Sequence, residues 1–158
     1  MSDKVLIRDY GSDDYADVAA LWEMAKLLQG NDSEELYRKQ LKRTPGLLIV
    51  AELDGVIVGA VYGFFPYSVW HLPRTRFGYI GHLAVNPQVH GMGIGSKLVE
   101  EICARLVKNG KSFVFLFATP MEAKSEDLYR FYRDRHGFKN TGRFFYKSCL
   151  VTPFFSGF

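Results

Sequence analysis

The sequence contains few cysteines, and they do not form a disulfide or metal-binding motif. Cys103 and Cys149 are the two cysteines of the chain, and neither belongs to a C-x-x-C motif. A disulfide framework or a thiolate metal site needs more cysteines at closer spacing. We therefore predict two reduced, buried thiols in a cytoplasmic protein that carries no metal.

A long apolar segment is also missing. The longest apolar stretch, residues 56–65, is interrupted by Gly59 and Gly63, and it is far shorter than the roughly 20 residues that cross a membrane. The chain does not open with a basic segment followed by an apolar core, so no secretory signal is predicted. Both absences argue against a membrane protein.

Charge of either sign is modest and dispersed. The formal net charge is +3, and the densest basic run, residues 130–135, is interrupted by Asp134. A nucleic-acid-binding protein is expected to concentrate its basic residues much more strongly. We interpret the run as the solvated face of a helix and expect no nucleic-acid partner. The length of 158 residues predicts a single domain over residues 1–158.

The most informative feature that is present is a glycine-rich turn between a strand and a helix. An apolar run over residues 79–85 precedes the turn, and an apolar stripe with helical spacing follows from Leu98. Gly91, Gly93 and Gly95 alternate within it. Glycines let backbone N–H groups approach a ligand, and the start of a helix adds unpaired donors and a positive dipole end. The segment therefore predicts an anion site, most naturally for phosphate.

The spacing excludes two common phosphate motifs. A P-loop places Lys before Ser or Thr, whereas here Ser96 precedes Lys97. A dinucleotide site needs G-x-G-x-x-G early in a βαβ unit and an acidic residue about 20 positions later. In this chain the glycines lie past the middle, and no acidic residue occurs near Phe115.

The remaining patterns predict a mixed α/β fold with a largely antiparallel sheet. Strands are expected at residues 5–10, 47–53, 56–65, 77–85, 112–118 and 143–151, and helices at residues 15–28, 33–44, 93–108 and 125–135. Asp54-Gly55 joins two of the strands and is a strong hairpin signal. With the return that begins at Gly137, the order of elements is βααβββαβαββ.

This order and three motifs resemble the GNAT N-acetyltransferases over essentially the whole chain. The family's acetyl-CoA loop reads roughly [Q/R]-x-x-G-x-[G/A], and here His90 stands for Gln or Arg before Gly91-Met92-Gly93-Ile94-Gly95. The preceding Leu83-Ala84-Val85-Asn86-Pro87 matches the family's strand and its exit. A later family helix carries an aromatic-Tyr pair, three residues and Gly-Phe, and the segment 131–138 has this pattern with one extra residue.

The resemblance implies a GNAT fold and an acetyltransferase that uses acetyl-CoA as its cosubstrate. Two central strands would splay apart, and the backbone N–H of Leu83 or Val85 would polarise the thioester carbonyl. Tyr132 would protonate the departing thiolate as general acid, with Tyr129 as its rival. The residues implied to hold the cosubstrate are Leu83, Ala84, Val85, His90, Gly91, Met92, Gly93, Ile94, Gly95 and Ser96.

The general base stays open at this point. Many family members use a Glu on the fourth strand, but no Asp or Glu occurs between Asp54 and Glu100. His82 on that strand is the first candidate, because histidine titrates near neutral pH. His71, an acid from residues 32–35 and a water relay are the alternatives.

The pleat of the fourth strand decides which of its side chains share a side. Regular alternation would put Tyr79 and Gly81 on one face and His82 on the other. A bulge in the strand would change that assignment.

The acceptor is predicted to be a primary amine of a small molecule or peptide that attacks directly in a ternary complex. The loop over residues 66–76 falls where the family's acceptor enters, and it is aromatic and basic without any acid. We therefore expect an apolar or anionic acceptor rather than a polycation, contacted by Tyr67, Trp70 and Tyr79. Packing of this loop on the core or on a second subunit is an equal alternative.

Two other functions compete with this prediction. The missing strand carboxylate favours a non-catalytic acyl-CoA sensor, and the sequence separates a protein N-terminal acetyltransferase only weakly from a small-molecule enzyme. The aromatic tail over residues 152–158 either covers the chain's own sheet or meets a second subunit in a homodimer.

Overall fold

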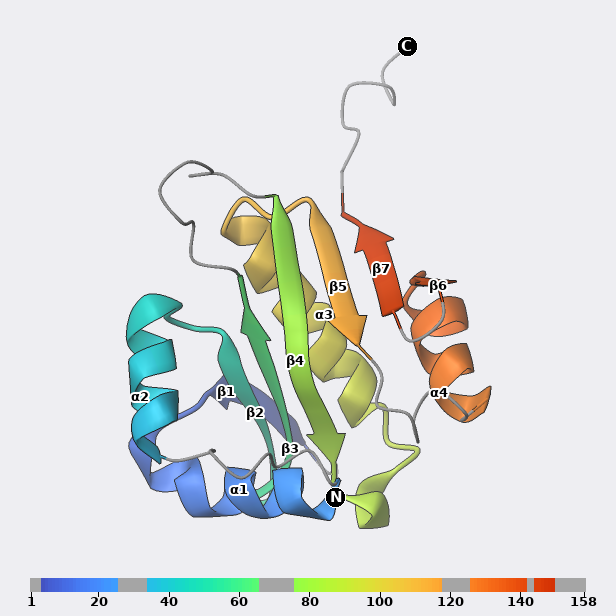
Figure 1. Cartoon of the computed structure of the whole chain (residues 1–158). Helices are drawn as coiled ribbons and strands as arrows, with labels where there is room; N and C mark the ends of the chain where they lie inside the picture. The colour runs from blue at the N-terminus through green and yellow to red at the C-terminus, as the bar shows by residue number, and fades with distance from the viewer. Residues whose placement is uncertain (1–3, 26–33, 66–75, 118–125, 142–143, 150–158) are drawn as a thin grey trace.

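The computed structural model describes residues 4–25, 34–65, 76–117, 126–141 and 144–149 (Figure 1). Its order βααβββαβαββ and its mixed α/β class confirm the prediction. The elements are β1 (Val5–Asp9), α1 (Tyr15–Met24), α2 (Glu34–Arg43), β2 (Leu48–Leu53), β3 (Val56–Phe64), β4 (Phe77–Val85), α3 (Ile94–Lys108), β5 (Phe113–Phe117), α4 (Glu126–Arg130), β6 (Lys139–Thr141) and β7 (Phe144–Ser148).

Within the described residues, the strands form one seven-stranded sheet in the order β1-β2-β3-β4-β5-β7-β6. Neighbouring strands are antiparallel except β4 and β5, which are parallel and are connected through α3. The β4–β5 ladder is short, because it runs only from the pair Phe77–Phe113 to the pair Ile80–Leu116. The rest of β4, from Gly81 to Val85, therefore lies beside a separation between the two strands.

The core consists of two apolar clusters, one on each face of the sheet. The face covered by α3, which lies behind the sheet in Figure 1, carries the larger cluster, with Ile49, Ile80, Val114 and Leu116 from the strands. The opposite face packs against α1 and α2 through Val18, Trp22, Tyr37, Val50 and Ala84. Side chains that alternate along β2 and β4 divide between these clusters, as expected for a strand buried on both sides.

Three glycines of the sheet let α3 approach closely. Leu98, Ile102 and Leu106 repeat every four residues on one face of α3, and such residues lie above one another. A Cβ atom added at Gly59, Gly63 or Gly78 would lie 3.0, 2.8 or 2.9 Å from a side-chain carbon of Leu98, Ile102 or Leu106, respectively. Larger residues at these positions would push α3 away from the strands that it covers.

A bulge in β4 changes the faces of its side chains. Tyr62 of β3 pairs with His82, while the next residue, Gly63, pairs with Ile80, so Gly81 is an extra residue on β4. Alternation restarts after Gly81, and His82 lies on the same face as Tyr79. The sequence prediction of opposite faces, which assumed regular pleating, is wrong for this reason.

Two further predictions differ in detail. Ala25 ends α1 with φ of −84° and ψ of 1°, so the helix stops before residue 28. Cys103 is buried, and burial raises the pKa of its thiol to about 12, whereas Cys149 is only half-buried. No helix in the described ranges combines the length and the apolar character that a membrane span would need.

Candidate functional site

The glycine-rich turn joins β4 to α3. The Asn86 side chain accepts a hydrogen bond from the Gln88 N–H at 3.0 Å and opens a 3-10 turn over Pro87–Val89. Gly91 and Gly93 follow with φ of 89° and 77°, in the left-handed region that favours glycine. Two of the three alternating glycines thus have a backbone conformation that a residue with a Cβ atom would strain.

The first turn of α3 has unpaired backbone donors beside the glycine-rich turn. The first intrahelical hydrogen bond runs from the Lys97 N–H to the Gly93 carbonyl, at 3.1 Å. The N–H groups of Ile94, Gly95 and Ser96 therefore have no carbonyl partner inside the helix. They lie at its positive dipole end, and together they can bind an anionic group such as a diphosphate.

His90 ties the turn back to the strand. Its Nε2 lies 2.9 Å from the Val85 carbonyl oxygen, and because a carbonyl only accepts, this nitrogen carries the proton. The sequence predicted His90 to be part of the cosubstrate loop, where it stands in place of the family's Gln or Arg. In the structure, its ring closes the turn over the end of β4.

The separated edge of β4 carries backbone groups that point away from β3. The Asn86 N–H donates to the Val58 carbonyl at 2.7 Å, so these two residues form a hydrogen-bonded antiparallel pair. Hydrogen-bonded and non-hydrogen-bonded pairs alternate along such a ladder. Leu83 and Val85 occupy the non-hydrogen-bonded positions, and their N–H groups point toward the side from which β5 has separated.

A cavity of about 520 Å³ lies between the turn, this edge of β4 and the helical segment that contains Tyr132. Tyr132 lines it together with nine of the ten residues predicted to hold the cosubstrate: Leu83, Ala84, Val85, His90, Gly91, Gly93, Ile94, Gly95 and Ser96. The tenth, Met92, is 39% exposed and does not line the cavity.

Other residues of the cavity wall were not singled out by the sequence. They come from the end of α1, the turn and the α4 segment: Ala25, Val89, Asp127, Leu128, Phe131 and Arg135. Ala84 belongs to the cluster of α1 and α2, whereas Leu83 and Val85 pack on the cluster of α3. The cavity is therefore lined from both faces of the sheet, at the place where β4 and β5 separate.

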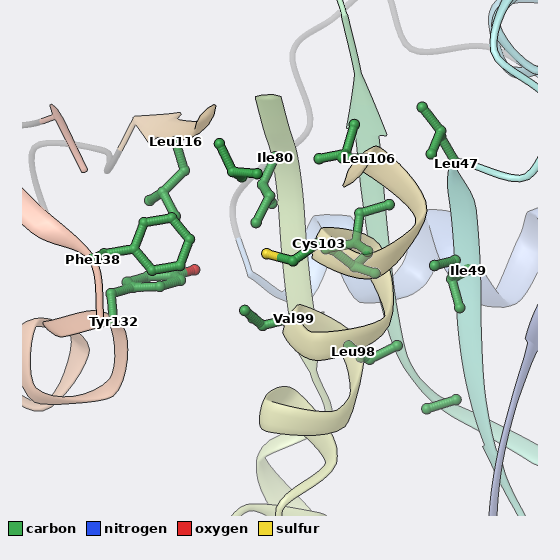
Figure 2. Packing of buried hydrophobic residues seen from close by; sticks show 14 of the residues in the cluster. Leu47, Ile49, Ile80, Leu98, Val99, Cys103, Leu106, Leu116, Tyr132 and Phe138 are labelled. Carbon is green, nitrogen blue, oxygen red and sulfur yellow. The ribbon is translucent and has the colours of Figure 1, made fainter. Parts of the chain in front are cut away.

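Tyr132 reaches the cavity from a helix with a widened end. α4 continues into a π turn over Phe131–Arg135, and a π turn accommodates one extra residue in a helix. The Tyr132 side chain is 6% exposed and packs against Phe138 and Phe145, with ring centroids 5.7 and 5.3 Å away. Figure 2 shows the Tyr132 ring beside that of Phe138 and extending toward α3.

Sequence reasoning missed His136 entirely. It is buried, and its Nε2 lies 3.1 Å from the Ser96 hydroxyl oxygen. Burial lowers the pKa of the imidazole below its usual range. No local signal in the sequence could have identified this residue, because Ser96 is 40 positions away.

His82 lies outside the cavity wall but on the face of the sheet that Ala84 shares. Its ring contacts Trp22 of α1 edge-to-face, with centroids 5.2 Å apart, and Tyr62 at 6.3 Å. Ala84 is the next residue of β4 on that face, and it does line the cavity. The bulge at Gly81 therefore places the candidate base beside the point where the strands separate.

Tyr79 belongs to a row of rings on the same face as His82. Stacked pairs join Tyr62 to Phe64, Phe64 to Tyr79 and Tyr79 to Phe115, with centroids 5.7, 5.3 and 5.6 Å apart. The row crosses β3, β4 and β5, and none of these strands contains an Asp or Glu. These three strands therefore contribute no carboxylate to this part of the sheet.

Two of the acids proposed as alternative bases form ion pairs along α2. Glu34 pairs with Arg38 at 3.0 Å, and Glu35 pairs with Lys39 at 3.1 Å, both along α2. Such exposed pairs contribute little to stability, but they hold these carboxylates at the helix surface. Across the residues that the structure describes, no cluster of three or more His, Cys, Asp or Glu is suited to a metal ion.

Several predicted residues lie outside the described part of the chain. These are Tyr67, Trp70 and His71 of the acceptor loop, Asp32, the tail over residues 152–158, and the side chain of Tyr129. Their roles stay predictions, as do the cytoplasmic location and the homodimer.

The comparisons with known proteins agree on one family. A model of the acetyltransferase (GNAT) family matches residues 16–138. An acetyltransferase of Pectobacterium atrosepticum is 34% identical over 111 residues, covering 66% of this chain and 69% of the relative. An acetyltransferase of Photorhabdus laumondii is 30% identical over 141 residues, covering 82% and 87%.

Solved structures have the same fold. A GNAT acetyltransferase from Brucella melitensis in complex with acetyl-CoA has a TM-score of 0.64 at 23% identity, covering 95% of this chain and 91% of that one. Diaminobutyrate acetyltransferase from Paenibacillus lautus, in complex with its substrate and coenzyme A, has 0.69 at 18%, covering 89% and 81%. Arabidopsis thaliana Naa50 with the bisubstrate analogue CoA-Ac-MVNAL has 0.70 at 19%, covering 91% and 98%.

The chain belongs to the GNAT family of acetyltransferases. The sequence prediction of an acetyl-CoA-dependent N-acetyltransferase is confirmed at this level. Acetyl-CoA combines an anionic diphosphate with a long, extended arm, and the cavity offers matching features. Its amides at Ile94, Gly95 and Ser96 suit the diphosphate, and the β4 edge at Leu83 and Val85 can pair with an extended chain.

Proposed function

We propose that this protein transfers the acetyl group of acetyl-CoA to a primary amine of an apolar or anionic small molecule or peptide. The transfer is direct, within a ternary complex of the enzyme and both substrates, and one domain over residues 1–158 performs it. The observation that carries this proposal is the cavity, because it joins the anion-binding turn, the β4 edge and the Tyr132 side chain in one space.

The turn and the strand hold the cosubstrate. The N–H groups of Ile94, Gly95 and Ser96 bind the diphosphate, and Gly91 and Gly93 let the backbone approach it. The backbone groups of Leu83 and the N–H of Val85, whose carbonyl already accepts from His90, pair with the extended arm. Acetyl-CoA supplies an acetyl group activated as a thioester.

Two groups of the chain stabilise the transition state, one by a hydrogen bond to the developing oxyanion and one by donating a proton. The N–H of Leu83 or Val85 donates to the oxygen on which negative charge develops, and a donor of this kind contributes about 3 kcal/mol. The Tyr132 hydroxyl is the general acid that protonates the leaving sulfur. Burial of Tyr132 among Phe131, Phe138 and Phe145 fixes its ring, which supports this role.

His82 is the general base that receives the proton of the acceptor amine. It shares the face of the sheet with Ala84 at the separation of β4 and β5. The Trp22 ring holds it edge-to-face. Neither β3 nor β4 carries a carboxylate that could take this part.

The acceptor approaches over the row of rings formed by Tyr62, Phe64, Tyr79 and Phe115. The row is apolar and lacks acidic neighbours on its own strands. A polyamine or aminoglycoside needs carboxylates to compensate its charges, so these rings favour an acceptor with an apolar or anionic body. The apolar surface of the rings suits an apolar body, and the ring edges, which carry partial positive charge, suit an anionic one.

The test separates binding from chemistry with Tyr132→Phe. This variant should keep its affinity for coenzyme A in calorimetry and lose about 10²-fold in kcat with a panel of amines, measured as free thiol released. Tyr37→Phe is the matched control, because Tyr37 is a buried tyrosine of the opposite cluster, and its kcat should be unchanged. Coenzyme A binding without thiol release from any acceptor in the unmodified protein would overturn the proposed function.

A further inference from the structure

The helix that carries Tyr132 ends in an unusual way. Gly137 has φ of 70° and closes the helix, with hydrogen bonds from the Phe138 N–H to the Tyr132 carbonyl at 2.9 Å and from the Gly137 N–H to the Arg133 carbonyl at 3.1 Å. At a usual helix end of this type the two bonds span five and three residues. Here they span six and four, so the π turn absorbs the extra residue before Gly137.

His136 fastens this wide turn to the start of α3. It is 6% exposed, and its Nε2 lies 3.1 Å from Oγ of Ser96. The His136 ring also contacts Phe131 edge-to-face, with centroids 4.8 Å apart. One imidazole therefore touches the first residue of the π turn and the first turn of the helix that binds the anion.

Both contacts of His136 lead to the cavity, although His136 itself does not line it. Ser96 and Phe131 are both part of the cavity wall. The Phe131 ring also limits the space at Gly95, where an added Cβ atom would lie 3.4 Å from Cζ of Phe131. A change at His136 can therefore reach the cavity only through these neighbours.

We propose that His136 is a positioning residue that couples the anion-binding turn at Ser96 to the placement of Tyr132 on the π turn. This inference rests on the proposed function, because it assigns Ser96 to the cosubstrate and Tyr132 to catalysis. The buried ring is neutral, since burial disfavours its charged form. A neutral Nε2 that faces a hydroxyl group fixes the Ser96 side chain while its backbone N–H stays directed at the anion.

The alternative is that His136 only fills the core. A core role would change the stability of the protein and leave ligand affinity and turnover in place once the protein is folded. Val114→Ala supplies the control, because Val114 is fully buried in the cluster that contains Tyr132 but lies away from the cavity wall. It should lower the melting temperature without changing the affinity for coenzyme A.

The experiment measures coenzyme A binding by calorimetry on the free protein, beside melting temperature and kcat. His136→Leu and Ser96→Ala should each raise the dissociation constant about three- to tenfold, the range for one lost hydrogen bond. The double variant should show no further loss, because the two side chains act through one contact. His136→Gln, which can still hydrogen-bond to Ser96, should restore most of the affinity.

Turnover gives a second readout. With saturating acetyl-CoA, kcat should fall in His136→Leu and recover in His136→Gln, as expected if the contact holds Tyr132 in place. Unchanged affinity and unchanged kcat in His136→Leu, or additive losses in the double variant, would overturn the coupling. Failure of the unmodified protein to bind coenzyme A would instead overturn the proposed function.

Discussion

Gly81 leaves room for the ring of Tyr62, which stands opposite the bulge. A Cβ atom added at Gly81 would lie 2.7 Å from Cδ1 of Tyr62. The ring of Tyr62 in turn contacts both His82 and Phe64. The absence of a side chain at Gly81 therefore permits the ring row and the orientation of the candidate base together.

Replacing Gly81 by Ala should damage the site and the fold, whereas Gly63→Ala should damage only the fold. Both added methyl groups meet a side chain at under 3 Å, so each variant should lose about 1–3 kcal/mol of unfolding free energy in urea. Only Gly81→Ala displaces His82, so its kcat/KM should fall about tenfold further. Equal kcat/KM in the two folded variants would contradict a role for the bulge.

Gly93→Ala should weaken coenzyme A binding. Its φ of 77° costs a residue with a Cβ about 1–2 kcal/mol, which the turn can relieve only by moving its amides. We expect the dissociation constant from calorimetry to rise roughly tenfold. Gly55→Ala is the matched control, because Gly55 has φ of 82° in the distant β2–β3 turn. Unaltered affinity in Gly93→Ala would argue against the anion site.

His82→Gln should change the pH profile of kcat/KM. A base must be unprotonated to accept the amine proton, so activity falls as the pH drops below about 6 to 7 for a histidine base. The variant should lose this acidic limb and about 10²-fold in kcat/KM. His90→Gln keeps a donor for the Val85 carbonyl and should retain the limb. An acidic limb that survives in His82→Gln would exclude His82 as the base.

Acid should destabilise the protein through His136. Burial lowers the pKa of its imidazole below 6.5, with a smaller effect of Lys147 and Arg135 in the same direction and an opposing one of Glu100. The unfolded chain therefore binds the proton first as the pH falls. The stability that this residue contributes is complete above pH 6.5 and decreases below it, toward the lowered pKa of the folded state. Urea unfolding between pH 7.5 and 5 should show a weaker pH dependence in His136→Gln, and identical slopes would contradict the assignment.

Local patterns account for what could be predicted from the sequence. The Asp54-Gly55 turn needs only two adjacent residues, and both have positive φ as a tight hairpin requires. The turn from Asn86 to Ser96 is likewise contained in one short segment. The order of strands and helices follows from apolar periodicity, which a single sequence displays directly.

What the sequence could not supply depends on contacts between distant segments. The bulge at Gly81 is set by the register between β3 and β4, in which Tyr62 pairs with His82 and Gly63 with Ile80, and alternation within β4 does not reveal it. Arg135 is exposed, as the prediction of a solvated basic face requires, but it also lines the cavity, which the basic run alone does not indicate. The His136–Ser96 contact joins two helices and has no trace in either segment alone.

The ladder between β4 and β5 is short, and it ends beside the proposed site. Only four residue pairs connect β4 with β5, whereas six connect β3 with β4. The first four strands and the last three of the described sheet are thus joined only through this short ladder, and α3 packs across it on one face of the sheet. A cosubstrate arm that pairs with Leu83 and Val85, as we propose, would add backbone hydrogen bonds to β4 where β5 no longer supplies them, so its binding should stabilise the folded sheet.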